Sequence, residues 1–156
     1  MALQIGAEAP DFEGRSTAGQ TVKLSDYRGN KHVLLVFYPF AFSRTCTGEF
    51  CQMRDEMPDI CSDEVEVLGV SPDSAFTLKA WKQAEGYVNE FVSDFWPHGE
   101  ISRAYGVFHE PSGSSMRGTF LIDKDGILRW MEIQEDWQAR DQSNWREALA
   151  GLGVPV

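Results

Sequence analysis

The apolar run from Val33 to Tyr38, which stops at Pro39, constrains the fold of this chain more than any other feature. The run is short and apolar throughout, which is typical of a strand buried on both faces of a sheet. Pro58 is expected to end the helix that follows. The sequence therefore predicts a central strand, a short loop and a helix, with Cys46 where the helix begins. The apolar residues after this cysteine recur at three- and four-residue spacing, as on one helix face: Phe50, Met53 and Met57.

This arrangement of a strand and a helix makes Cys46 a candidate for chemistry. Unpaired backbone N–H groups and the positive end of the helix dipole gather at the start of a helix. Both stabilise a thiolate, which is the reactive form of cysteine. The hydroxyl residues Ser43 and Thr45 stand beside it. Cys46 is therefore the candidate nucleophile, and the alternative is an inert buried cysteine.

Length and composition are those of an ordinary globular domain. The 156 residues, 42% of them hydrophobic and 24% charged, fit a single domain that spans residues 1–156. The formal charge of −10 argues against nucleic acid and against an anionic membrane surface as partners. Residues 1–8 contain neither a basic stretch nor an apolar core, so we expect no signal peptide. The longest apolar run is too short to span a bilayer.

The three cysteines indicate a reducing compartment. They are too few, and odd in number, for a disulfide framework, so the sequence favours a cytoplasmic protein. None of the three histidines stands at a metal-ligand spacing from a cysteine, so we expect no metal site. Cys61 is expected to be structural because it lies far along the chain from Cys46.

Strand and helix patterns alternate along the rest of the chain. Their order predicts an α/β fold with a central mixed sheet and helices on both faces. An Asp-Gly turn between two extended runs is a strong hairpin signal. The expected elements are a hairpin around 16–20, a helical turn at 24–27, strands at 65–70 and 91–93, a helix capped at Asp73 or Ser74, helices starting at Glu100 and Trp145, and a hairpin of 119–123 with 127–133.

The cysteine motif resembles the active-site motif of the peroxiredoxins, which are cysteine-dependent peroxidases with a thioredoxin-like fold. It reads Pro39-x-x-x-Ser43-x-x-Cys46, with Glu49 three residues further on. The resemblance covers nearly the whole chain and implies the thioredoxin-like fold. Its later part is most similar to the alkyl hydroperoxide reductase E type. The other segments that carry the resemblance are 6–12, 93–94, 94–99, 104–108 and 117–123.

The resemblance implies a role for each residue of the motif. The Cys46 thiolate would attack the terminal oxygen of a peroxide and become a sulfenic acid. Ser43, where the family usually has threonine, would hold the thiolate and the peroxide by hydrogen bonds. Pro39 would shield the thiolate from water. The plainer roles of Ser43 and Pro39 are a helix cap and a strand terminator.

Two arginines and a glutamate complete the site that the resemblance implies. Arg117 matches the family's active-site arginine, whose guanidinium would stabilise the thiolate and the charge on the breaking O–O bond. Glu49 would orient an arginine rather than carry a proton. Arg140 is similar in position to a second arginine of this subgroup. A lone arginine before a strand is otherwise a surface residue, so these assignments depend on the resemblance.

Because of Cys51, the sequence allows two routes for the reduction of the sulfenic acid. Enzymes of the E type are typically one-cysteine peroxidases that use an external thiol. Bacterioferritin-comigratory-type peroxiredoxins often carry a resolving cysteine five residues after the reactive one, and Cys51 has that spacing from Cys46. Five residues along a helix separate the Cα atoms by roughly 8 to 9 Å, while a disulfide tolerates about 7 Å, so a bond requires the helix to unwind. Cys51 is either the resolving cysteine or a packing residue.

The activity implied is a thiol-dependent reduction of hydrogen peroxide, organic hydroperoxides and peroxynitrite. No metal, haem or flavin cofactor is implied, because the cysteine carries the redox change. The reducing partner would be thioredoxin, mycoredoxin or a low-molecular-weight thiol. A homodimer is expected, since the chain lacks the long C-terminal extension of the decameric types. The aromatic segment 94–99 would line the active-site mouth, form a subunit contact or pack as a loop.

Two other interpretations assign the chain to different classes of protein. One is a redox-sensing or chaperone-like interaction protein that oxidation of Cys46 switches. Turnover with a reducing thiol separates it from an enzyme. The other is a thioredoxin-type disulfide reductase, which normally needs a Cys-x-x-Cys motif that the sequence lacks.

Overall fold

The computed structural model describes the backbone of residues 3–60, 63–135 and 137–154 and, except at residues 57–60, their side chains. Its elements, in chain order, are β1 (Glu13–Ser16), β2 (Thr21–Lys23), the 3₁₀ turn η1 (Leu24–Tyr27), β3 (His32–Phe37), α1 (Arg44–Ile60), β4 (Val65–Ser71), α2 (Ala75–Glu85), β5 (Glu90–Ser93), α3 (Glu100–Ala104), β6 (Phe108–His109), β7 (Ser114–Ser115), β8 (Arg117–Ile122), β9 (Leu128–Gln134) and α4 (Gln142–Gly151).

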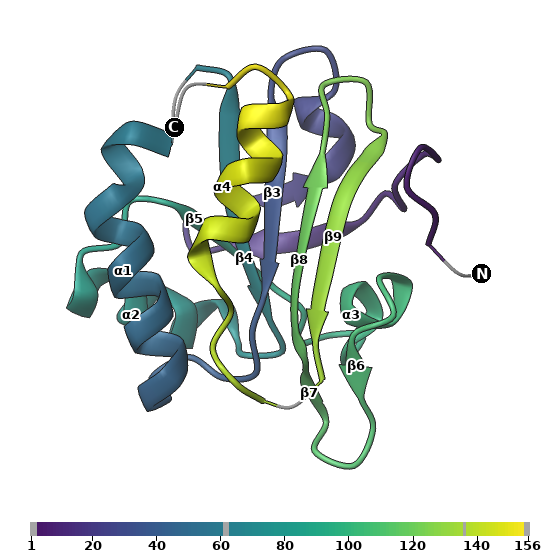
Figure 1. Cartoon of the computed structure of the whole chain (residues 1–156). Helices are drawn as coiled ribbons and strands as arrows, with labels where there is room; N and C mark the ends of the chain where they lie inside the picture. The colour runs from purple at the N-terminus through teal and green to yellow at the C-terminus, as the bar shows by residue number, and fades with distance from the viewer. Residues whose placement is uncertain (1–2, 61–62, 136, 155–156) are drawn as a thin grey trace.

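Seven strands form one mixed sheet in the order β2-β1-β5-β4-β3-β8-β9, with β3 and β4 near its middle (Figure 1). β3 pairs parallel with β4 and antiparallel with β8. β4 and β5 are parallel, whereas β1 with β2 and β8 with β9 form antiparallel hairpins. The predicted α/β class, the mixed sheet and the central position of the first long strand are confirmed.

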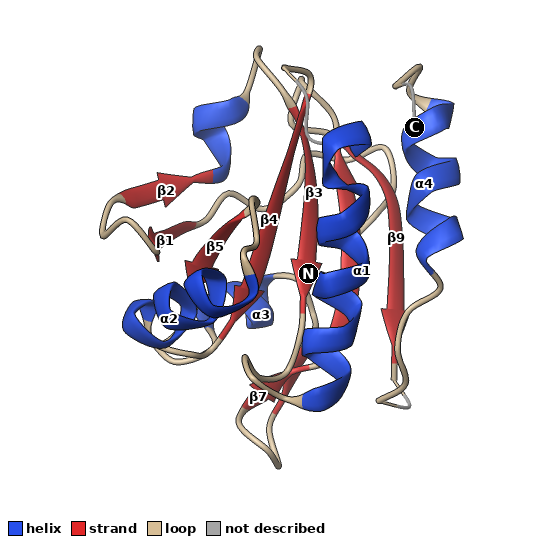
Figure 2. Ribbon diagram, turned by 90° about the vertical axis from the view of Figure 1, so that its left-hand side faces the viewer, coloured by secondary structure: helices blue, strands red, loops and turns tan. Residues whose placement is uncertain are grey.

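Two hydrophobic cores lie on opposite faces of this sheet. Successive side chains of a strand point to opposite faces, so an uninterrupted apolar strand supplies both cores. α1, α2 and α4 cover one face and pack against Leu34 and Val36 of β3. Figure 2 shows α1 and α4 side by side, and Figure 1 shows α3 across the sheet from α1. The β3 residues that face α3 and η1 are Val33, Leu35 and Phe37.

An aromatic cluster fixes the first half of α1 on the sheet. The fully buried ring of Phe50 has its centroid 4.8 Å from that of Tyr38 and 5.4 Å from that of Trp81. Tyr87 and Phe91 lie 5.9 and 5.3 Å from the same ring. Burying a phenylalanine side chain contributes about 1.5–3 kcal/mol. Core packing therefore sets the position of the helix turn that carries the candidate nucleophile.

Local sequence signals determine the ends of several elements as predicted. Ser74 caps α2, and its hydroxyl accepts a hydrogen bond from a backbone N–H of the first helical turn at 3.2 Å. Gly126, in the turn before β9, has a φ of 81°, which glycine adopts without strain. Asp123 closes the same turn by accepting hydrogen bonds from the N–H groups of Asp125 and Ile127.

Three details of the prediction are wrong. α1 continues through Pro58 to Ile60, because the φ to which proline is restricted is also a helical value. The sequence does not predict the hairpin of β6 and β7, since strands of two residues leave no alternation to detect. α4 begins at Gln142 rather than Trp145, because the side chain of Asp141 caps the helix.

Candidate active site

Cys46 lies in the first turn of α1, after the end of β3, as the sequence predicts. The residue has no exposed surface. Ser43 precedes the helix, and its Oγ accepts a hydrogen bond from the Cys46 N–H at 3.3 Å while its carbonyl accepts one from Thr47 at 2.9 Å. Ser43 therefore caps α1 and holds the thiol at the positive end of the helix dipole.

Arg117 is the charged neighbour of this thiol. It begins β8, which pairs with β3, and it is buried. Its Nη2 donates to the Cys46 Sγ at 3.2 Å, its Nε to Oε1 of Glu49 at 2.9 Å, and its Nη1 to the carbonyl of Trp137 at 2.9 Å. Because each of its three nitrogens has a partner, the guanidinium is held in one orientation. A fixed positive charge at this distance stabilises a thiolate.

Glu49 joins Arg117 to a second buried arginine, Arg140. The Oε2 of Glu49 accepts a hydrogen bond from the backbone N–H of Arg140 at 2.8 Å and lies 3.0 Å from its Nε. The Nη2 of Arg140 donates to the carbonyl of Phe37 at 2.6 Å. The pKa of Arg140 lies below its ordinary value because burial outweighs the attraction of Glu49. One carboxylate thus stands between two buried guanidinium groups.

Pro39 is buried directly after β3, in the loop that leads to the cysteine. Asp73 holds this loop: its Oδ2 accepts hydrogen bonds from the Ala41 N–H at 2.8 Å and from the Ser71 hydroxyl at 2.7 Å. Phe42 of the same loop has a φ of 67°, which is costly for a bulky residue. The sequence offered Asp73 only as an alternative to Ser74 for the cap of α2, and its contact with this loop was not predicted.

Two other groups that the sequence analysis missed are backbone carbonyls. The carbonyl of Trp137 accepts a hydrogen bond from Arg117, and that of Phe37 accepts one from Arg140. Every residue has a carbonyl, so no sequence signal distinguishes these two. Only the tertiary fold brings these two carbonyls within hydrogen-bond distance of the arginines.

Cys51 has different neighbours from Cys46. Its Sγ lies 3.5 Å from Oε2 of Glu85 and 3.6 Å from the hydroxyl of Tyr87, at the end of α2 and beyond it. Both thiols are free, and α1 is continuous between them. The structure therefore gives each thiol its own environment. Cys61, for which the sequence predicts a structural role, lies outside the described residues.

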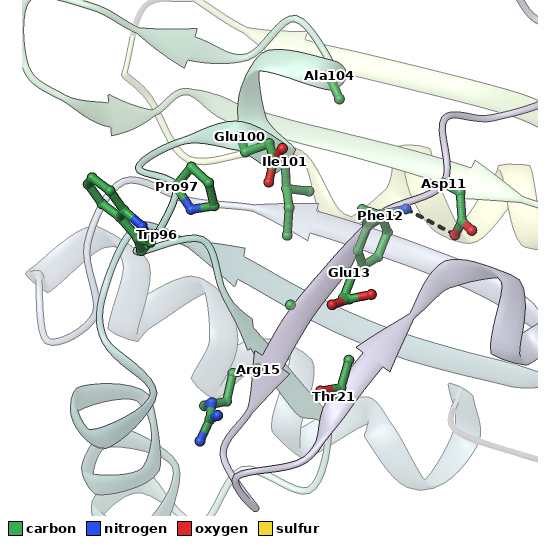
Figure 3. A pocket seen from close by; sticks show the side chains of 11 residues that line it. Asp11, Phe12, Glu13, Arg15, Thr21, Trp96, Pro97, Glu100, Ile101 and Ala104 are labelled. Atoms are coloured by element: carbon green, nitrogen blue, oxygen red, sulfur yellow. Dashed lines mark hydrogen bonds between the residues drawn. The ribbon is translucent and has the colours of Figure 1, made fainter.

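The aromatic segment 94–99 contributes two residues to the lining of a pocket. Phe95 and Trp96 are largely exposed, so the segment is not a fully packed loop. Trp96 lines a pocket of about 560 Å³ together with Phe12 and Arg15 (Figure 3). Among the described residues, neither the thiol nor its charged neighbours line this pocket.

The described residues offer neither a metal site nor a membrane-spanning helix. Within it, no three side chains of His, Cys, Asp or Glu gather closely enough to hold a metal ion. Over the same residues, no helix combines the length and the apolar character that crossing a bilayer requires.

Known proteins similar to this chain decide its family. The model of the AhpC/TSA family matches residues 5–131. The chain is 46% identical over 150 residues to alkyl hydroperoxide reductase E of Mycobacterium tuberculosis, with 96% of this chain and 98% of that protein covered. This chain belongs to the AhpC/TSA family and is a peroxiredoxin. It is also 34% identical to thioredoxin peroxidase of Fasciola hepatica, over 86% of this chain and 73% of that protein.

Solved structures agree with the thioredoxin-like fold of this peroxiredoxin. Enterococcus faecalis AhpC superposes with a TM-score of 0.86 at 29% identity, covering 99% of this chain and 95% of that one. The reduced 2-Cys peroxiredoxin of Plasmodium vivax gives a TM-score of 0.83 at 29% identity, with 96% of each chain covered. The expected family, fold and enzyme class, a thiol-dependent peroxidase, are therefore confirmed.

Proposed function

We propose that this peroxiredoxin reduces hydrogen peroxide, organic hydroperoxides and peroxynitrite with the sulfur of Cys46. The observation that carries the proposal is the 3.2 Å contact between Nη2 of Arg117 and the Cys46 Sγ inside a buried ionic network. A peroxidase needs a reactive sulfur and a fixed positive charge at one point, and this contact brings the two together. The names of two relatives, alkyl hydroperoxide reductase E and thioredoxin peroxidase, support the same substrate class.

In the oxidative step the Cys46 thiolate attacks the terminal oxygen of the peroxide. The S–O bond forms as the O–O bond breaks, and the electron pair of the broken bond leaves on the second oxygen. That oxygen takes a proton and departs as water or an alcohol, or nitrite departs from peroxynitrite. The sulfur remains as a sulfenic acid. Negative charge moves from the sulfur to the leaving oxygen, and the Arg117 guanidinium stabilises it along this path.

The neighbouring residues orient the reacting groups. Glu49 holds the guanidinium of Arg117 through a buried ionic contact, and Arg140 holds the other oxygen of Glu49. The hydroxyl of Ser43, already at the helix start, orients the sulfur and the peroxide. Pro39 offers no N–H to water and keeps solvent away from the thiolate. All these residues act on one sulfur atom.

A thiol from outside the chain reduces the sulfenic acid. It attacks the sulfur of Cys46 and releases water, which leaves a mixed disulfide. A second thiol then attacks that disulfide, regenerates Cys46 and carries the oxidising equivalents away as a new disulfide. Thioredoxin, mycoredoxin and a low-molecular-weight thiol all supply this chemistry.

Cys51 is a packing residue in this proposal. A bond between Cys46 and Cys51 requires the first turns of α1 to unwind. Phe50 would then leave the aromatic cluster, which costs about 1.5–3 kcal/mol in addition to the helix hydrogen bonds. The thiol of Cys51 also contacts the Glu85 carboxylate and the Tyr87 hydroxyl.

Peroxide consumption with dithiothreitol as the reductant tests the proposed activity. The wild type and Cys51→Ser are expected to consume hydrogen peroxide and cumene hydroperoxide, and to react with peroxynitrite, while Cys46→Ser does not. Oxidation of Cys46 without turnover would favour the redox-sensing or chaperone-like interpretation. A Cys46 that does not react with peroxide at all would overturn the proposal.

We also propose that the protein is a cytoplasmic homodimer. Phe76, Phe95 and Trp96 are 86%, 53% and 82% exposed, and they line one groove. Exposed apolar side chains that gather in one place are typical of interaction surfaces. Sedimentation velocity is expected to show a dimer that Trp96→Glu converts to a monomer and that Val88→Glu, at another exposed apolar residue, leaves intact. A monomeric wild type would contradict the proposal.

A further inference from the structure

The loop that joins β9 to α4 contributes two backbone groups to the buried ionic network. The Trp137 carbonyl accepts a hydrogen bond from Nη1 of Arg117 at 2.9 Å. Three residues later, the backbone N–H of Arg140 donates to Oε2 of Glu49 at 2.8 Å. The loop therefore contacts the charged network at Arg117 and at Glu49, and its conformation determines where the Arg117 guanidinium points.

Trp137 holds a backbone conformation that its side chain disfavours. Its φ is 64°, in the left-handed region where a bulky residue is strained. Among the described residues with positive φ, all except Trp137 and Phe42 are glycines. A glycine at position 137 would adopt this φ without strain. The presence of a tryptophan therefore indicates that a contact of its ring compensates for the strain.

The ring of Trp137 packs against a histidine from another part of the chain. It meets the ring of His109 edge to face, with centroids 4.8 Å apart and planes at 90°. The other side of His109 is fixed as well, because its Nδ1 lies 2.8 Å from Oγ of Ser112. The backbone of the β6–β7 hairpin is closed by a hydrogen bond from the Gly113 N–H to the His109 carbonyl at 2.9 Å. The hairpin thus offers a rigid support for the ring.

We propose that Trp137 is a positioning residue for Arg117. The contact of its ring with His109 holds its backbone in the left-handed conformation, and this conformation aims the Trp137 carbonyl at Nη1 of Arg117. With Nη1 and Nε both bound, the remaining edge of the guanidinium faces the sulfur of Cys46. The inference rests on the proposed role of Cys46 as the peroxide-reactive thiol.

The test combines changes at the two rings in a protein whose other two cysteines are serine. The variants are Trp137→Ala, Trp137→Gly, Trp137→Phe, His109→Ala and the double alanine variant. Two quantities are measured: the rate of sulfenic acid formation at Cys46 with hydrogen peroxide, by quenched-flow mass spectrometry, and the pH profile of Cys46 alkylation by iodoacetamide. Alkylation needs no peroxidase activity, so it reports on Arg117 even if the proposed function fails.

We expect Trp137→Ala and His109→Ala each to slow sulfenic acid formation about tenfold, a smaller effect than loss of a donor itself. Both should move the alkylation profile to higher pH, because a displaced guanidinium stabilises the thiolate less. Trp137→Phe should restore both quantities, since it keeps a ring against His109. Trp137→Gly should fail like the alanine variant, because it removes the ring along with the strain. The double variant should be no worse than Trp137→Ala.

Three results would overturn the proposal. One is a Trp137→Ala or Trp137→Gly variant with the rate and the pH profile of the wild type. Another is a His109→Ala variant without effect, which would remove the support assigned to the hairpin. The third is a double variant whose loss is the sum of the two single losses. If the tryptophan variants do not fold, His109→Ala and His109→Phe, which keeps an aromatic ring, decide the question by themselves.

Discussion

The Nη2 of Arg117 lies 3.2 Å from the Sγ of Cys46, although the two residues are 71 positions apart in the chain. The sheet creates this contact. β3 and β8 are antiparallel neighbours in which Val36 pairs with Thr119, so Arg117 stands level with the end of β3. The loop to Cys46 leaves the sheet at the same end. Both residues are buried, so little solvent screens the charge between them.

Arg117→Lys is expected to lower the rate of sulfenic acid formation about 100-fold, because one ammonium group cannot serve three partners in fixed directions. Those partners are the Cys46 sulfur, the Glu49 carboxylate and the Trp137 carbonyl. Single-turnover kinetics with hydrogen peroxide measure the rate. Arg103→Lys, at an exposed ion pair, is the control and should react like the wild type. An unchanged rate in Arg117→Lys would show that charge alone suffices.

Glu49→Gln is expected to destabilise the fold by about 3–5 kcal/mol, because it removes the carboxylate charge that two buried guanidinium groups share. Glu49 contacts Arg117 at 2.9 Å and Arg140 at 3.0 Å, and all three side chains are almost completely buried. Urea unfolding followed by circular dichroism gives the difference. Glu110→Gln removes a partner from an exposed pair and should change stability little. Equal stability of the two variants would contradict the assigned role of Glu49.

Cys51→Ser is expected to leave the oxidation product of Cys46 unchanged. After one equivalent of peroxide, both the wild type and the variant should gain the mass of one oxygen, because the aromatic cluster around Phe50 opposes unwinding of α1. Intact-mass spectrometry and a thiol count measure this directly. A wild type that instead loses two thiols and two hydrogens, in a reaction that Cys51→Ser abolishes, would establish Cys51 as the resolving cysteine.

Asp123→Asn is expected to lower the free energy of unfolding, and the size of this loss is expected to depend on pH. Burial raises the pKa of Asp123, but hydrogen bonds from Arg129, Ile127 and Asp125 outweigh it and bring the pKa below its ordinary value of 3.8. When the pKa of a carboxyl is lower in the folded than in the unfolded state, the carboxylate stabilises the fold at pH values above the unfolded-state pKa. This stabilisation is lost as the pH falls through the folded-state pKa. The variant should therefore be less stable at neutral pH.

The difference between Asp123→Asn and the wild type should shrink as the pH falls below about 3.8. Chemical unfolding at a series of pH values follows it. Asp125→Asn changes an exposed residue of the same turn and serves as the control. A stability gap that stays constant down to strongly acidic pH would show that the hydrogen bonds of Asp123 do not depend on its charge.

Much of the fold could be predicted because it follows from neighbouring residues. The apolar run at 33–38, the Asp-Gly turn before Ile127 and the cap at Ser74 each specify local structure, and the structure has the corresponding elements. The hairpin of β6 and β7 could not be predicted, since its strands are too short to show a pattern. The helix limit at Pro58 was predicted wrongly, because proline disfavours a helix interior without preventing a final turn.

The sequence by itself determined the place of the candidate nucleophile: a cysteine in the first helical turn after a buried strand, with a hydroxyl residue as the helix cap. Hydrogen bonds and hydrophobic periodicity between near neighbours are sufficient for that. Only the tertiary structure decided which atoms surround the sulfur. Arg117 reaches it through strand pairing, and the carbonyls of Phe37 and Trp137 fix the two arginines. Backbone carbonyls are common to all residues, so their selection depends on how distant segments pack together.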